Sequence, residues 1–96
     1  MLFVVLKKDK PDHEKVRADV RPAHLEFLNA NKDKIAFGGP IMSEDGARMV
    51  GSILTVEAAS PVEAKAFLEN DPFAKAGLFE STEVVPWKWV FKNPNP

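Results

Sequence analysis

The chain has 96 residues, of which 45% are hydrophobic and 28% are charged, with 13 basic against 14 acidic side chains. These proportions are typical of one globular domain, and a net charge of -1 with interspersed signs leaves no basic surface for DNA or RNA. The absence of cysteine excludes disulfides, thiolate catalysis and metal sites with cysteine ligands.

The chain opens on an apolar run, Leu2 to Leu6, which predicts a first strand. The run is far shorter than the roughly 20 residues of a membrane span and has no basic stretch before it. We therefore expect no membrane segment and no secretion signal, and hence a cytoplasmic protein.

Apolar residues at spacings of three and four then predict a helix over residues 12–31. Pro22 lies inside this stretch and lacks the N–H that a helix interior needs. We expect it to kink the helix or to split it at Arg21.

Two further strands are expected over residues 35–42 and 48–57, joined by a turn at Asp45-Gly46 that favours a hairpin. Both strands contain glycine, at Gly38-Gly39 and at Gly51. Glycine in a strand marks a bulge or bend, or alternatively a place where a ligand approaches the backbone.

A capping box at Ser60-Pro61-Val62-Glu63 predicts a second helix that ends near Asn70. Asp71-Pro72 then begins a short third helix up to Gly77, because the residue before a proline is biased out of the helical region.

A last strand is expected over residues 82–91, with Pro86 at an edge or a bulge, before a frayed tail over residues 92–96. This element order predicts an α+β, ferredoxin-like βαββαβ fold with a four-stranded antiparallel sheet, in one domain over residues 1–96. Two helices cover only one face of such a sheet, yet the strands are apolar on both faces. We therefore expect a homodimer that packs the two sheet faces together.

His24 is the stronger of the two histidines as a candidate for chemistry. It lies at the edge of the apolar helix stripe beside Arg17 and Arg21, whereas His13 lies in the polar first turn. The position of His24 suits either a core histidine bonded to a backbone carbonyl or a pocket histidine with cationic neighbours. Asp71 can cap the third helix and still offer an oxygen that orients an imidazole.

The aromatic residues Trp87, Trp89 and Phe91 alternate along the last expected strand, which favours core or interface packing over stacking on nucleic acid. His24 has no second histidine at ligand spacing, so we expect no metal site. The sequence also has no glycine-rich nucleotide motif and no nucleophilic serine motif, so we expect no cofactor.

As a set, six segments resemble the YCII (YciI-like) family of small bacterial proteins, and the resemblance extends to about Phe91. These segments are Arg17-x-x-x-Arg21-Pro22-x-His24-Leu25-x-x-Leu28, Gly39-Pro40, Gly51-Ser52, Ser60-x-x-Glu63-Ala64, Asn70-Asp71-Pro72-Phe73-x-x-Ala76-Gly77-Leu78-Phe79 and Val85-Pro86-Trp87. The resemblance implies a ferredoxin-like fold that dimerises through its sheets, as a dimeric α/β barrel. It also implies an active site centred on a histidine and an aspartate, which here match His24 and Asp71.

These residues predict a cofactor-independent enzyme in which His24 is the general acid and base and Asp71 holds its tautomer. Such a pair suits isomerisation or a lyase-type elimination on a small, anionic or ring-containing metabolite. Arg21, with Arg17, would attract an anionic oxygen, and Ser52 would donate a hydrogen bond. The alternative is a non-catalytic module that binds a small ligand or serves assembly.

Overall fold

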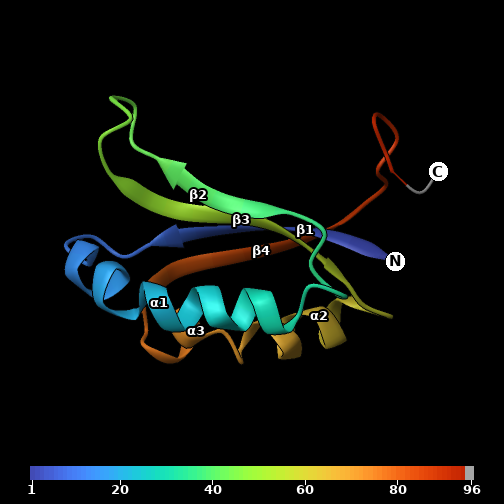
Figure 1. The fold of residues 1–96 in the computed structure, drawn as a ribbon, viewed down its shortest axis with the longest axis horizontal. Helices are drawn as coiled ribbons and strands as arrows, with labels where there is room; N and C mark the ends of the chain where they lie inside the picture. The colour runs from blue at the N-terminus through green and yellow to red at the C-terminus, as the bar shows by residue number, and fades with distance from the viewer. Residues whose placement is uncertain (95–96) are drawn as a thin grey trace.

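A computed structural model describes residues 1–94 as two layers, a four-stranded antiparallel sheet with the helices packed on one face (Figure 1). Along the chain the elements are β1 (Leu2–Asp9), α1 (Glu14–Ala30), β2 (Gly38–Met42), β3 (Met49–Glu57), α2 (Pro61–Leu68), α3 (Pro72–Lys75) and β4 (Phe79–Trp87). The strand order β2-β3-β1-β4 places β1 and β3 at the centre. This is the expected ferredoxin-like α+β fold. No helix within residues 1–94 is long and apolar enough to cross a membrane.

The core forms between the helices and the inward face of the two central strands. Phe3 pairs with Val56, and Val5 pairs with Leu54, so the period-two alternation brings apolar side chains together beneath α2. The buried cluster comprises Phe3, Val5, Leu54, Val56, Ala58, Ala64 and Leu68. The same alternation continues to Lys7 and Asp9, whose charged side chains are also buried on the helix side. β1 therefore extends three residues beyond the apolar run that opens the chain.

Of the two sequence signals for helix boundaries, the capping box at Ser60 predicted the structure correctly and Pro22 did not. The capping box is confirmed at its cap, because the Ser60 hydroxyl accepts a hydrogen bond from the Glu63 amide at 3.2 Å. The expected split at Arg21 is wrong, since α1 continues through Pro22 to Ala30. Pro22 is exposed, and Arg17 and His24 anchor the turns on either side of it, so tertiary contacts compensate for the lost helical hydrogen bond.

Like β1, the strands β2 and β4 differ from the expected bounds, and β3 begins one residue later than expected, at Met49. β2 begins at Gly38 and not at residue 35, because the amides of Ala36 and Phe37 donate to the Thr55 side chain. β4 covers Phe79–Trp87 and not residues 82–91, because its antiparallel partner β1 begins at Leu2, opposite Trp87, and ends at Asp9, opposite Phe79. β4 is an edge strand, as Pro86 indicated.

The aromatic residues after β4 do not continue the strand. The Trp89 indole donates to the Phe91 carbonyl at 2.7 Å, and its ring packs on Trp87 with centroids 6.1 Å apart. Asn93 donates to the Trp89 carbonyl at 3.1 Å. Of the tail expected to fray at 92–96, residues 95 and 96 lie outside the described residues.

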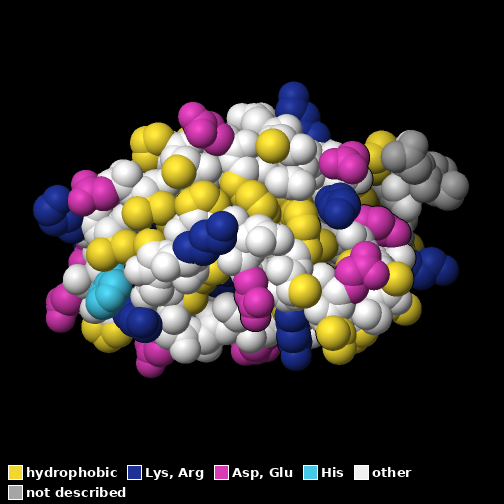
Figure 2. All heavy atoms as spheres, turned by 90° about the horizontal axis from the view of Figure 1, so that it is seen from below, with side chains coloured by type: hydrophobic (Ala, Val, Ile, Leu, Met, Phe, Trp, Pro, Cys, Tyr) yellow, Lys and Arg dark blue, Asp and Glu magenta, His cyan; other side chains and the backbone are white. Residues whose placement is uncertain are grey.

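The two sides of the molecule carry different surfaces. On the helix side, basic and acidic side chains are interspersed among apolar atoms without a large area of one charge (Figure 2). The opposite face of the sheet exposes large apolar side chains from β1, β3 and β4. These are Leu6, Ile53, Val85 and Trp87, each between 37% and 45% exposed.

Candidate active site

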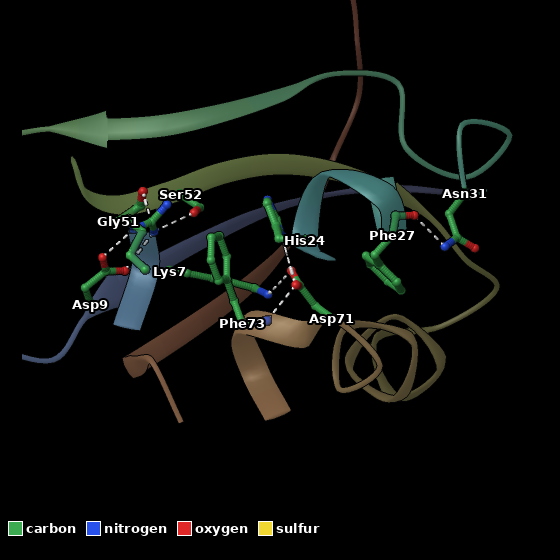
Figure 3. Close-up of polar contacts among 10 residues, drawn as sticks. Lys7, Asp9, His24, Phe27, Asn31, Gly51, Ser52, Asp71 and Phe73 are labelled. Carbon is green, nitrogen blue, oxygen red and sulfur yellow. Dashed lines mark hydrogen bonds and ion pairs between the residues drawn. The ribbon is translucent and has the colours of Figure 1, made fainter. Parts of the chain in front are cut away.

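The structure brings together His24 on α1 and Asp71 at the N-terminal cap of α3, two residues that are 47 positions apart in the chain (Figure 3). The Nδ1 atom of His24 lies 2.9 Å from Oδ1 and 3.0 Å from Oδ2 of Asp71. Because an ionised carboxylate only accepts hydrogen bonds, the neutral imidazole carries its proton on Nδ1 and its lone pair on Nε2. The second ring nitrogen points away from Asp71 in Figure 3, so it is the atom able to accept a proton.

Asp71 is fixed in place by the backbone of α3 as well. Its Oδ1 accepts from the Phe73 amide at 2.9 Å, so the expected helix cap and the imidazole contact coexist. The Phe73 ring stacks on the imidazole with centroids 4.0 Å apart and planes inclined by 19°. The carboxylate and the aromatic ring together restrict how His24 can rotate.

Arg17 forms a second buried polar cluster beside this pair. Its guanidinium binds both oxygens of Asp9, at 2.7 and 2.9 Å, and donates to the Gly51 carbonyl and the Ser52 hydroxyl at 3.0 Å each. Since the Ser52 oxygen accepts from Arg17, its own hydroxyl proton is available to a further acceptor. Arg17 also lies 4.7 Å from the centre of the Phe73 ring, which links the two clusters.

Position 51 must be glycine because the backbone of β1 lies very close to it. A Cβ atom at this position would lie 2.4 Å from the Lys7 carbonyl, so any side chain would push the central strands apart. Of the two roles considered for glycine here, the structure therefore gives Gly51 a packing role.

A pocket of about 160 Å³ opens between α1, β2 and β3. The polar residues that line it are Arg17, Arg21, His24 and Ser52, and its apolar lining includes Leu28 and Pro40. The structure thus brings four of the five candidate residues to one cavity, while the fifth, Asp71, lies behind His24. Of the two arginines, Arg17 is buried and fully engaged, whereas Arg21 is exposed.

A larger hollow, about 790 Å³, lies elsewhere, at the end of the sheet near the β2–β3 hairpin. It contains neither His24 nor Asp71, so we place the candidate site at the smaller pocket, where polar groups converge. Among residues 1–94, no three His, Asp or Glu side chains are grouped so as to hold a metal ion.

Sequence reasoning did not identify two charged residues of this region, Lys7 and Asp9. Lys7 is buried behind Asp71, with Nζ 3.7 Å from Oδ2, and Asp9 pairs with Arg17. Burial lowers the pKa of Lys7 below the ordinary lysine value and Arg17 lowers it further, while Asp71 opposes both effects. The sequence did contain a signal for the burial of these two residues. Phe3 and Val5 lie two positions apart on one face of the strand, and continuing this spacing places Lys7 and Asp9 on the same buried face.

The sequence profile of the YCII-related domain matches residues 1–88. Protein YciI of Escherichia coli O6:H1 is 36% identical over 98 residues, covering 95% of this chain and all of that protein. The 5-chloro-2-hydroxyhydroquinone dehydrochlorinase of Burkholderia phenoliruptrix, solved with 2,5-dihydroxybenzoquinone, is 47% identical, covers 92% of this chain and 94% of its own, and superposes with a TM-score of 0.82. A protein from Agrobacterium tumefaciens shares the fold alone, with 13% identity, 98% coverage of both chains and a TM-score of 0.55.

Proposed function

Because the chain belongs to the YCII-related domain family, we propose that it is an enzyme that eliminates a small leaving group from a hydroxylated ring compound. The observation that carries this proposal is the His24 imidazole, bonded to Asp71 through Nδ1 and lining a small pocket. The dehydrochlorinase relative supports the lyase class of reaction and the ring-containing class of substrate.

In the proposed reaction, the ring first takes a keto form, in which a hydroxyl proton has moved to the carbon that bears the leaving group. Nε2 of His24 then accepts a proton from another hydroxyl of the substrate. The electron pair of that O–H bond forms a carbonyl, the neighbouring ring double bond shifts to the carbon that bears the leaving group, and the leaving group departs with the pair from its bond to that carbon. Asp71 stabilises the imidazolium that forms, because its carboxylate accepts the hydrogen bond from Nδ1–H throughout.

The opposite wall of the pocket would stabilise a developing oxyanion. The Ser52 hydroxyl has a proton to donate, and Arg17 fixes the position of its oxygen. Arg21 lines the same pocket, and its side chain makes no hydrogen bond or ion pair within residues 1–94, so it serves to attract an anionic substrate. A volume of about 160 Å³ suits one small ring and not a larger ligand.

The test is turnover of 5-chloro-2-hydroxyhydroquinone, followed by chloride release. We expect His24→Asn, whose amide can keep the bond to Asp71, to lower kcat by at least about 100-fold. His13→Asn is the matched control, because that ring lies at the surface and contacts the Pro11 carbonyl. Activity within a few-fold of wild type in His24→Asn would overturn the proposal. Binding of 2,5-dihydroxybenzoquinone without turnover of any chlorinated ring would favour the non-catalytic alternative.

We also propose that the enzyme is a homodimer that packs the open sheet faces together. The exposed apolar residues of β1, β3 and β4 form a surface of the kind that monomers rarely leave in water. Light scattering at micromolar concentration should give twice the mass of the chain, and Ile53→Glu should give a monomer. Val62→Glu is the control, since Val62 is 78% exposed on α2. A monomeric wild-type protein would remove the proposal.

A further inference from the structure

Lys7 has a setting unlike that of any other lysine in the described chain. Its side chain is 1% exposed, and its ammonium is the one buried side-chain polar atom of residues 1–94 that has no hydrogen-bond partner. Its ion-pair partner is Oδ2 of Asp71, 3.7 Å away, which is too long for a hydrogen bond. In Figure 3, Lys7 reaches Asp71 from β1, while His24 reaches it from α1.

Two groups beside the Lys7 nitrogen favour its charged form. One is the Asp71 carboxylate, and the other is the Phe79 ring, whose centre lies 4.5 Å from Nζ. Burial acts in the opposite direction and lowers the pKa of Lys7. A buried cation without hydrogen bonds is unfavourable for folding, so packing alone does not explain a lysine at this position.

Charge balance around the site gives Lys7 a role. The buried charges are Arg17 with Asp9 and Lys7 with Asp71, next to His24. The other charged groups that line the neighbouring cavities are exposed. They are Lys8 on β1, Lys10 and Asp12 after it, Glu14 and Arg21 on α1, Arg48 before β3, Lys65 on α2, Glu69 at the C-terminal cap of α2, and Glu80 and Glu83 on β4.

The two buried ion pairs and His24 together have zero net charge for only one protonation state of the imidazole. When Lys7 is charged, the two ion pairs cancel, and the group is neutral with a neutral His24. Without the Lys7 charge, Asp71 would be left as an excess negative charge, and a protonated His24 would restore neutrality. Lys7 therefore opposes protonation of His24 through the carboxylate that the two side chains share.

We propose that Lys7 is a positioning residue of the candidate site, whose buried ammonium balances the Asp71 carboxylate so that His24 stays neutral and free to accept a proton. This inference rests on the proposed function, in which Nε2 of His24 takes a proton from the substrate. It adds a third member to the pair, acting on the base and not on the substrate.

The first experiment is an NMR titration of the His24 ring in Lys7→Met, a variant of similar length without the charge. We expect the ring to titrate about one pH unit higher than in wild type, because the cation that opposed protonation is gone. Lys8→Met is the matched control, since it removes the same charge from an exposed neighbour in the same strand, and His13 is the internal reference. An unchanged or lower midpoint in Lys7→Met would overturn the inference.

A second measurement needs no Lys7 variant and so holds even if that variant does not fold. The Lys7 side-chain carbon next to the amine is followed against pH by NMR in wild type and in Asp71→Asn. We expect a charged amine at pH 7 in wild type and a lower titration midpoint in Asp71→Asn. An amine that is already neutral at pH 7 in wild type would overturn the inference.

Activity supplies a separate readout. A plot of kcat/KM against pH should rise as His24 loses its proton and becomes the free base. In Lys7→Met, this rise should move to higher pH by the same interval as the ring titration. The NMR measurements use no substrate, so the proposed function can fail while the Lys7 inference stands. Equal titrations with altered turnover would overturn the inference and leave the proposed function intact.

Discussion

The site contains two buried cations, each next to a carboxylate, and they are held very differently. Arg17 makes four hydrogen bonds, two of them to Asp9, whereas Lys7 makes none and lies 3.7 Å from Asp71. The planar guanidinium presents several donors in a fixed fork, so it can satisfy a carboxylate, a carbonyl and a hydroxyl at once. The Arg17 pair therefore fixes geometry, and the Lys7 pair acts through charge alone.

This difference matters for how each pair relates to the candidate chemistry. The Arg17 pair ties α1 to β1 and β3 and orients the Ser52 hydroxyl, so its loss should disturb the pocket wall and the fold together. The Lys7 pair touches the same carboxylate as His24, so its loss should change proton affinity more than shape.

The largest effect is expected from Arg17→Met. Removing one partner of a buried, hydrogen-bonded pair leaves Asp9 uncompensated, which lowers the free energy of unfolding by about 3–5 kcal/mol. Urea unfolding followed by tryptophan fluorescence measures this loss. Arg48→Met is the control, because the Arg48–Glu14 pair is more than half exposed and should contribute at most about 1 kcal/mol. Equal losses in the two variants would mean that the Arg17 cluster does not hold the fold.

Asp71→Asn should shift the titration of His24 in the direction opposite to Lys7→Met. The amide keeps the shape and the helix cap but removes the negative charge that favours the imidazolium, so the ring should titrate about one to three pH units lower. NMR of the ring protons against pH measures the midpoint, with His13 unchanged as the reference. A His24 midpoint equal to that of wild type would mean that Asp71 serves only as the cap of α3.

The smallest effect concerns the pH dependence of stability. Because burial lowers the pKa of Lys7 in the folded state, the unfolded chain binds more protons between the folded and unfolded pKa values. The free energy of unfolding should therefore rise with pH in that window, by about 1.4 kcal/mol for each unit of lowering. Urea unfolding between pH 7 and pH 10 should show this rise in wild type and not in Lys7→Met. Parallel pH profiles would contradict a lowered Lys7 pKa.

The sequence alone determined the order of the elements, because the signals for them are local. An apolar run marked the first strand, Ser60 and Glu63 marked the start of α2, and Asp71-Pro72 marked the start of α3. The position of His24 at the edge of an apolar stripe also identified it as a candidate from helical spacing alone. These features depend on residues a few positions apart in the chain, so a sequence displays them directly.

Tertiary structure decided what depends on partners far along the chain. The end of β4 is set by where the antiparallel strand β1 begins, and α1 continues through Pro22 because Arg17 and His24 anchor it on both sides. The sequence could not choose between a backbone and a carboxylate partner for His24, since Asp71 lies 47 residues away. The burial of Lys7 and Asp9 likewise appears only once α1 and α3 cover the end of β1. A charged residue gives no sign in the sequence that it will be buried, because its burial depends on which distant elements pack over it.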